Sequence, residues 1–416
     1  MTAQSQPIKL VVLAMATAAL ALLVAVASPP GPEVAQAKGT PTTFLLSRAL
    51  GGGAPNGPST HAVLSNDKRY VRAVAFQSEA SDLVRGDTNG VSDVFVVRRA
   101  GHIDNEGVPW TIGGTSLISR TGGKGPANGP SFSPSIDGAF HSAPTCVGFL
   151  SAASNLVGGD SNGQVDAFVA KISGSSGPRR VSLPGGRQSN APTTAVAVSG
   201  DCSSIAFVTG GRIYVSKKGG RAQAVGGPGN AADPSYSTGL RNDLVFGATG
   251  GVYLAKDSKR PHLVGRGGRN PAYNDIKRQV VAYEKTIRGH SQIAYHDIGK
   301  GERVISSGHG MGDGDSVNPV IGNSGYYVAF QTGASNLSTN QGSFGDRNGA
   351  IDSYVYTDTR KITLVESLTP DGRLIPAGGE NPSMSFYSNY VVFDTPSNLD
   401  RGSGQRQVFM RYVGGK

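Results

Sequence analysis

Helical periodicity is missing from almost the whole sequence. Beyond the N-terminal segment, no stretch places apolar residues at i, i+3 and i+4, which argues against helical folds. Charged residues make up only 16% of the 416 residues, yet apolar residues recur in short runs, so the composition does not indicate disorder. These Val, Ile, Phe and Tyr runs alternate with Gly, Asn, Asp and Pro, a pattern typical of all-β proteins.

Cysteine, histidine and tryptophan are also scarce. Cys146 and Cys202 lie three and five residues before Phe149 and Phe207, near the start of equivalent segments. One bridge between adjacent repeats is therefore expected in an exported protein, with two buried free thiols as the alternative. The seven histidines show no zinc-binding spacing. Trp110 is the only tryptophan, and the absence of a recurring pocket aromatic argues against a sugar-binding repeat protein.

The N-terminus has the features of an export signal. Lys9 precedes an apolar run over 10–27, and Ala35-Gln36-Ala37 gives a small-x-small cleavage pattern. We predict that residues 1–37 are an export signal peptide. The run is just long enough to span a membrane, so an uncleaved N-terminal anchor is the alternative. Either interpretation predicts an exported body that is periplasmic, at the cell surface or secreted.

A two-part pattern recurs seven times along the rest of the chain. In each copy, a proline one to four residues after an Asn or Asp precedes a short apolar strand containing an aromatic anchor. The anchors are Phe76, Phe149, Phe207, Phe246, Tyr283, Phe330 and Phe393. The prolines, interpreted as one equivalent turn, are Pro58, Pro130, Pro192, Pro234, Pro271, Pro319 and Pro382. Such self-similarity indicates a repeat architecture.

The count of strands predicts how the repeats close. Each repeat has a third strand after the anchor strand, but a fourth strand, such as 116–119, follows only the first six. The N-terminal segment 44–48 (FLLSR) matches 116–120 (SLISR) and can complete the last repeat. We therefore predict an all-β fold with one seven-bladed β-propeller over 38–416, whose ring is closed by an N-terminal strand. Six blades are the alternative, because the fourth and fifth repeats are short.

The repeat resembles the TolB-like propeller repeat of exported bacterial proteins. The residues that carry the resemblance are Pro130-Ser131, 135–138 (SIDG), 147–149 (VGF) and 166–169 (DAFV). The family's Ser-Pro-Asp-Gly turn is degraded elsewhere, as at Asn66-Asp67. The resemblance implies a propeller fold, and roles as an interaction platform, a sensor module or the non-catalytic half of a peptidase.

An acidic loop, D-x-N-G-x-x-D, recurs three times after an Ala-Ser-Asx-Leu element. Its polar residues are Asp87, Asn89 and Asp93, then Asp160, Asn162 and Asp166, then Asp346, Asn348 and Asp352. Carboxylate and amide oxygens on a tight loop are suitable calcium ligands, although the final Glu of an EF-hand is missing. Asn-Gly is also a strong hairpin signal. The loops therefore predict either Ca²⁺ as a cofactor or structural turns.

Basic residues are concentrated in the middle repeats. From Arg179 to Arg303 there are 19 Lys and Arg against 8 Asp and Glu, a net charge of 19 − 8 = +11. The most clustered are Lys217, Lys218, Arg221, Lys256, Lys259, Arg260, Arg266, Arg269, Lys277 and Arg278. Such a field attracts an anionic polymer or an acidic protein of the envelope, whereas specific nucleic-acid binding is not expected after export. A merely solvated basic face is the alternative.

These observations favour a non-catalytic binding or interaction module at the cell envelope. The sequence indicates no catalytic residues, so enzymatic activity is not the favoured interpretation. The alternatives are a propeller hydrolase or lyase acting on an anionic polymer, and a structural envelope scaffold. Since one propeller scaffold serves many roles, fold alone does not choose among them.

Overall fold

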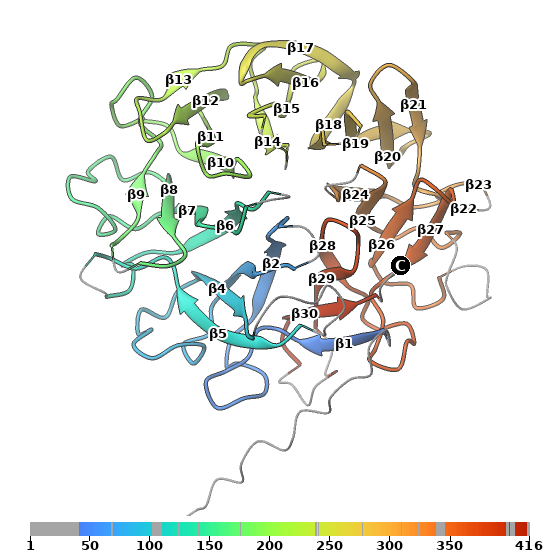
Figure 1. The fold of residues 1–416 in the computed structure, drawn as a ribbon, viewed down its shortest axis with the longest axis horizontal. Coiled ribbons are helices and arrows are strands. Elements are labelled where there is room, and N and C mark those ends of the chain that lie inside the picture. The colour runs from blue at the N-terminus through green and yellow to red at the C-terminus, as the bar shows by residue number, and fades with distance from the viewer. Residues whose placement is uncertain are drawn as a thin grey trace, which may run out of the picture. The chain divides into compact units, whose positions relative to one another are not determined.

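A computed structural model describes residues 41–413 apart from 68–69, 102–109, 123–124, 140–141, 175, 238, 240, 277, 309, 323–324, 338–345, 397–398 and 400–403. The predicted export segment 1–37 lies outside these residues. Within them, no helix is long and apolar enough to cross a membrane. Seven four-stranded antiparallel sheets surround a central axis, which confirms the predicted all-β, seven-bladed propeller (Figure 1).

Six blades take four consecutive strands each. Blade 1 is β2 (Ser59–Leu64), β3 (Ala73–Ser78), β4 (Asp93–Arg99) and β5 (Ile112–Leu117), and blade 2 is β6 (Ser131–Ile136), β7 (Cys146–Ser151), β8 (Asp166–Lys171) and β9 (Arg179–Arg180). Blade 3 is β10 (Thr193–Val198), β11 (Ser204–Thr209), β12 (Arg212–Lys217) and β13 (Gln223–Ala224), and blade 4 is β14 (Ala232–Tyr236), β15 (Leu244–Ala248), β16 (Gly251–Lys256) and β17 (Lys259–Arg266). Blade 5 is β18 (Gly268–Asn274), β19 (Val280–Ile287), β20 (His290–Asp297) and β21 (Gly301–Val304), and blade 6 is β24 (Ser316–Ile321), β25 (Tyr327–Thr332), β26 (Asp352–Thr357) and β27 (Ile362–Val365). A small hairpin, β22 (Ser307–Gly308) and β23 (Gly310–Met311), lies between blades 5 and 6.

The two ends of the chain share blade 7. Its strands β28 (Glu380–Met384), β29 (Tyr390–Thr395) and β30 (Gln407–Tyr412) are completed by β1 (Thr42–Leu45), which pairs antiparallel with β30. The predicted closure by an N-terminal strand is thereby confirmed. A buried ion pair between Arg411 Nε and Glu366 Oε2, 3.2 Å apart, and a bond from Arg411 to Thr43 Oγ1 hold this junction.

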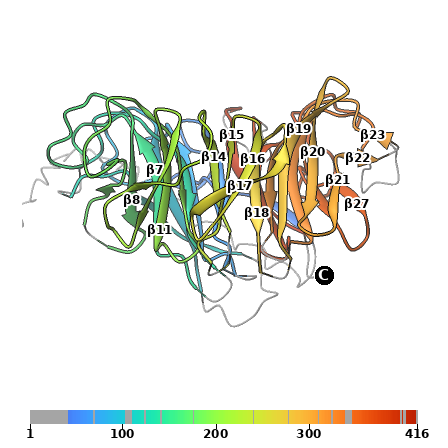
Figure 2. The ribbon, with the colours of Figure 1, turned by 90° about the horizontal axis from the view of Figure 1, so that it is seen from above.

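The strand order gives the ring two distinct faces. In every blade the first strand lines the centre, and the connection from the second to the third strand lies at one face, here called the loop face (Figures 1 and 2). The turns from the first to the second strand and from the third to the fourth lie at the other, here called the hairpin face. The acidic loops 87–93, 160–166 and 346–352 therefore all lie at the loop face.

The aromatic anchors form the core of each blade. All seven are fully buried, and in six blades the anchor stands directly opposite an aromatic residue of the third strand. Phe76 and Phe95, for example, have ring centroids 5.8 Å apart. Directly opposed aromatic pairs stabilise antiparallel sheets beyond their buried area. In blade 5, Tyr283 packs instead against Gly265 and Gly268, where an added Cβ would come within 3 Å of the ring.

The recurrent prolines fall into two structural classes, so the prediction of one equivalent turn is wrong. Pro58, Pro130 and Pro192 directly precede the first strand of their blades. Pro234, Pro271, Pro319 and Pro382 lie inside the first strand, at a β-bulge after a residue with positive φ. A bulge removes one N–H from the ladder, so proline is tolerated there, and the preceding Asp or Asn accepts the left-handed conformation.

Candidate functional site

The second aspartate of each acidic loop forms a structural clasp at the start of the third strand. Asp93 accepts a hydrogen bond from Ser119 Oγ, which itself accepts the N–H of Val94 at 3.0 Å. Asp166 with Ser182, and Asp352 with Ser367, repeat this arrangement. In blades 5 and 7 glutamine replaces the aspartate, as in the bond from Ser47 Oγ to Gln407 Oε1. The sequence signal that we missed is the buried serine that follows the fourth strand in five of the seven blades.

The loop asparagines connect neighbouring blades. Asn89 Oδ1 accepts the N–H of Val91, while its Nδ2 donates to Asp93 and to the carbonyl of Ala127 in the next blade. Asn162 and Asn348 make the same three bonds. The carboxamide oxygens are thus used by the turn, so the geometry leaves the aspartates as the candidate cation ligands.

Burial raises the pKa of aspartates in these loops. It raises the pKa of Asp93 to about 7, against the hydrogen bonds from Ser119 and Asn89, and the nearby Asp87 raises it further. The pKa of Asp352 is likewise raised to about 7, by burial and by its contact with Asp346. Carboxyl groups with such pKa values are candidates for a functional role, although structural networks produce the same shift.

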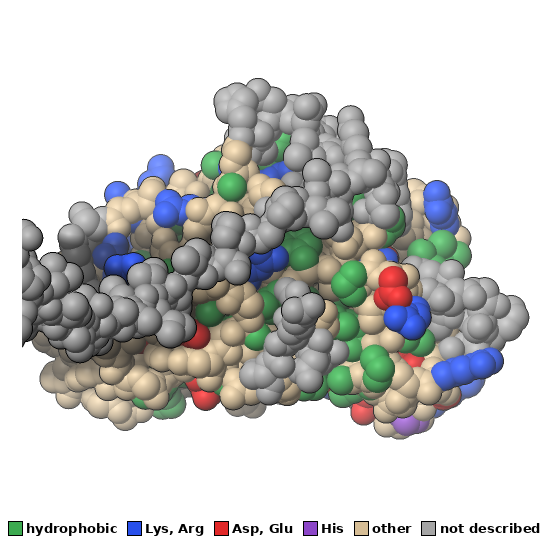
Figure 3. All heavy atoms as spheres, turned by 90° about the horizontal axis from the view of Figure 1, so that it is seen from below, with side chains coloured by type: hydrophobic (Ala, Val, Ile, Leu, Met, Phe, Trp, Pro, Cys, Tyr) green, Lys and Arg blue, Asp and Glu red, His purple; other side chains and the backbone are tan. Residues whose placement is uncertain are grey.

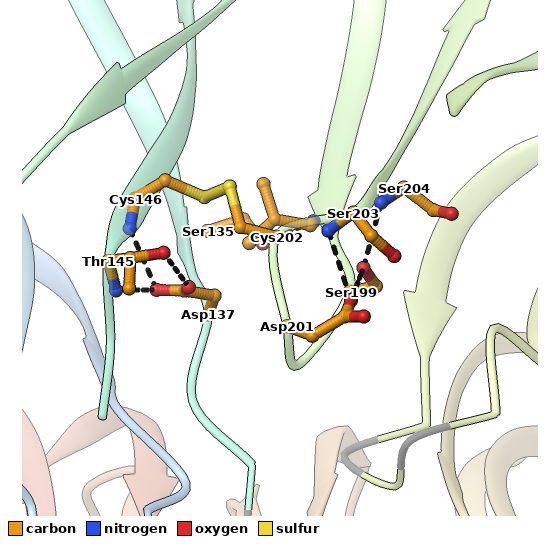
Figure 4. Close-up of a disulfide and its surroundings, with 10 residues drawn as sticks. Ser135, Asp137, Thr145, Cys146, Ser199, Asp201, Cys202, Ser203 and Ser204 are labelled. Atoms are coloured by element: carbon orange, nitrogen blue, oxygen red, sulfur yellow. Dashed lines mark hydrogen bonds between the residues drawn. A yellow bond between two sulfur atoms is a disulfide. The ribbon is translucent and has the colours of Figure 1, made fainter. Parts of the chain in front are cut away.

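Cys146 and Cys202 form a disulfide that joins blade 2 to blade 3 at the hairpin face, with their Cα atoms 6.2 Å apart (Figure 4). The carboxylate of Asp137 lies within 4.8 Å of the sulfur atoms and accepts hydrogen bonds from the N–H groups of Thr145 and Cys146. Since both sulfurs are bonded to each other, neither is a thiolate ligand. This group is therefore a structural staple.

The predicted basic residues do not form a single surface. Six gather at the hairpin face in two neighbouring turns, here called the basic hairpins: Lys217, Lys218 and Arg221 in blade 3, and Lys256, Lys259 and Arg260 in blade 4. The two turns are joined by Asp257, which pairs with Lys217 at 2.8 Å and Lys259 at 3.2 Å.

The other predicted members of the patch lie elsewhere. Arg266 and Arg269 lie toward the loop face, and Arg269 pairs with Glu284 at 3.0 Å. Arg278 lies in the β18–β19 turn at the hairpin face, where it pairs with Asp297 and Asp358, and Lys277 is outside the described residues. On the rim beside β1 and β5, Lys and Arg side chains are scattered (Figure 3).

A cavity of about 520 Å³ follows the central channel and is lined by all seven first strands. At the bulges, one polar residue per blade faces this cavity, and together these residues are called the channel ring: His61, Ser133, Thr194, Asp233, Asn270, Asn318 and Asn381. The four from blades 1 to 4 are exposed. Asn270 Nδ2 donates to Asn318 Oδ1, and Asn381 Nδ2 donates to Asp394.

The residue after the aromatic anchor fastens the channel ring to the neighbouring blade. In four blades its side chain accepts a backbone N–H from the channel-ring residue of the next blade. Gln77 accepts the N–H of Ser133 at 2.9 Å, and Glu284 accepts the N–H of Asn318 at 2.9 Å. Gln331 accepts the N–H of Asn381 at 2.7 Å, and Asp394 accepts the N–H of His61 at 3.0 Å. In blades 2 to 4 this position is Leu150, Val208 and Gly247. The signal in the sequence was the polar residue after four anchors, which we missed because alternate strand positions are often polar.

Comparisons with known proteins concern the fold alone. No family model and no curated protein matches the sequence. Among solved structures, the chain is similar to TolB from Acinetobacter baumannii (15% identity, 65% of each chain, TM-score 0.39). It is also similar to a putative TolB from Agrobacterium tumefaciens (13% identity, 72% of this chain and 94% of that chain, TM-score 0.37). TolB structures are thus among those that this propeller resembles, as the sequence predicted.

Peptidases are also among the similar structures. A puromycin-hydrolysing peptidase of Mycobacterium tuberculosis is 11% identical, with a TM-score of 0.48 over 90% of this chain and 56% of that chain. The chain therefore spans little more than half the length of that enzyme and 65% of the A. baumannii TolB.

Proposed function

We propose that this propeller is an exported, non-catalytic binding module of the cell envelope, and that the channel ring holds an extended segment of a partner protein. The observation that carries the proposal is the composition of the ring. It presents three carboxamides, two hydroxyls, one imidazole and one carboxylate around a cavity of about 520 Å³. A peptide backbone needs both donors and acceptors at close spacing, and these groups supply both.

The two halves of the channel ring have different tasks in this proposal. The carboxamides of blades 5 to 7 are fixed by hydrogen bonds to Glu284, Asp394 and one another. The exposed residues of blades 1 to 4 offer side chains to a ligand at the mouth. Because the carboxamides are already fixed, fewer side chains of the ring need to be ordered when a segment binds. The lower entropic cost favours binding.

A second candidate function rests on the basic hairpins. Of the six cations in these turns, Lys217 and Lys259 pair with Asp257, and Arg179 of blade 2 lies beside Gly219 of the blade 3 turn. Within the two basic hairpins, six Lys and Arg side chains stand against one Asp, so the local field is positive. This surface suits an anionic polymer of the envelope, held by contacts that weaken with salt.

Site-specific photocrosslinking in intact cells tests both proposals. A photoreactive residue in place of Thr194 reports on the channel ring, and one in place of Lys218 reports on the basic hairpins, with each position serving as the other's control. A crosslink from position 194 to one defined peptide segment supports the first proposal, and salt-sensitive adducts with polymer from position 218 support the second. Protein crosslinks that form only at position 218 would overturn the channel assignment, and turnover of the captured polymer would favour an enzyme.

A further inference from the structure

In blade 2, an arginine occupies the centre of the acidic loop. Arg180 Nη1 lies 2.8 Å from Asp160 Oδ1 and 3.3 Å from Asp166 Oδ2, and Nη2 lies 3.4 Å from the carbonyl oxygen of Gly159. Three oxygens therefore converge on one cationic group. The guanidinium neutralises two carboxylates that are almost completely buried, with exposed fractions of 5% and 1%. Buried carboxylates without such a partner are costly.

The equivalent loop of blade 1 has the same oxygens without the arginine. Strand register places Leu117 opposite Phe95, as Arg180 is placed opposite Phe168, so the position of the cation holds an apolar side chain. Asp87, the equivalent of Asp160, is only 6% exposed, and its Oδ1 has no hydrogen-bond partner. This is the same oxygen that Arg180 contacts in blade 2. A buried carboxylate oxygen without a donor indicates a missing positive charge.

Blade 6 repeats the arrangement of blade 1. Val365 pairs with Tyr354 at the register position of Arg180, and it is fully buried. Asp346 Oδ2 has no hydrogen-bond partner, while the carboxyl groups of Asp346 and Asp352 contact each other. In two of the three acidic loops, the carboxylates thus come together without an ion pair to Lys or Arg among the described residues; Arg347 of blade 6 is exposed.

We propose that the acidic loops of blades 1 and 6 each bind one calcium ion, and that Arg180 takes the place of this ion in blade 2. The ligands from the chain are Asp87 and Asp93 in blade 1, and Asp346 and Asp352 in blade 6. Calcium suits these loops because it accepts carboxylate and carbonyl oxygens in irregular geometry and completes its shell with water, whereas magnesium requires an octahedron. With two carboxylates per site, an affinity of about 10⁻⁴ M is expected. The inference is independent of the proposed function.

The test is calcium stoichiometry, measured by calorimetric titration of the full chain and of three variants. The wild-type chain is expected to bind one ion for each of the two loops. Leu117→Arg supplies the guanidinium to blade 1 and removes one binding equivalent. Arg180→Leu empties the centre of the blade 2 loop and adds one. Arg179→Leu is the matched control, because it removes a neighbouring arginine outside the loop, and it leaves the stoichiometry unchanged.

Each result decides the proposal. A wild-type chain that binds no calcium overturns it, as does binding that Leu117→Arg and Arg180→Leu leave unaltered. Should Leu117→Arg fail to fold, Arg180→Leu against Arg179→Leu still decides, because only the former is expected to gain an ion. Equal response to magnesium at the same concentration would overturn the choice of calcium.

Discussion

Loss of the disulfide between Cys146 and Cys202 should destabilise the propeller by a calculable amount. The bridge closes a loop with a sequence separation of 56 residues. In the chain-entropy treatment, opening such a loop restores about 14 cal/mol/K to the unfolded chain, or about 4 kcal/mol at 25 °C. With an unfolding entropy of about 2.1 cal/mol/K per residue over the propeller, roughly 0.8 kcal/mol/K in total, the melting temperature should fall by about 5 °C.

The assay compares thermal unfolding of the oxidised chain, the reduced chain and the Cys146→Ala/Cys202→Ala variant. Reduction breaks the link without deleting side-chain atoms, so it isolates the entropic contribution. The double variant also loses packing, because Cys146 is buried against Leu150 and Phe207, and should melt slightly lower. Adding reductant to the double variant controls for effects unrelated to the bridge. A reduced chain that melts within 1 °C of the oxidised chain would refute the reasoning.

Three further predictions concern the acidic loops and the ring closure. The pKa of Asp93 and of Asp352 is raised from 3.8 to about 7, so the folded chain holds these two protons more tightly than the unfolded chain does. The stability that this difference provides is complete below pH 3.8 and is lost as the pH rises through 7. In chelator, the melting temperature should therefore fall from pH 5 to pH 8, and a rise over this range would contradict the assignment. Glu366→Ala leaves Arg411 buried without its carboxylate and should cost about 3–5 kcal/mol in urea unfolding, where a loss below 1 kcal/mol would argue against the pair. Ser119→Ala removes the clasp from Asp93 and should cost about 1–3 kcal/mol by the same measurement, with no change contradicting its role.

The sequence was informative wherever one residue type has one structural role. Phe76 and its six equivalents are predictable because a buried aromatic at a fixed place in each repeat has few other uses. Proline is different, because two kinds of position accept its fixed φ and missing N–H. One is the residue before a strand, as at Pro58, and the other is a bulge, as at Pro319. The fourth strand of blade 1 was displaced: the prediction of 116–119 corresponds to Ile112–Leu117, because Ile118 and Ser119 remain buried past the end of the ladder.

The candidate site was less predictable because its partners are distant in the chain. Arg180 lies 20 residues from Asp160, on β9 rather than in the acidic loop, and no local spacing relates them. Arg278 was assigned to the basic patch because Asp358, its partner 80 residues away, lies in another blade. The acidic loops were recognised as a motif, but only their geometry distinguishes the loop with an internal cation from the two without one.

The shared last blade has a consequence for how the molecule is made. β1 is among the first segments synthesised and β30 among the last, and neither finds its partner until the other exists. The first repeats can collapse early, but the ring stays open until translation is finished, with an unpaired strand edge on each side of the gap. A ribosome that stalls before residue 407 would therefore release six blades that are ready to pair with another copy. Closure of the ring therefore depends on both ends of the chain being present.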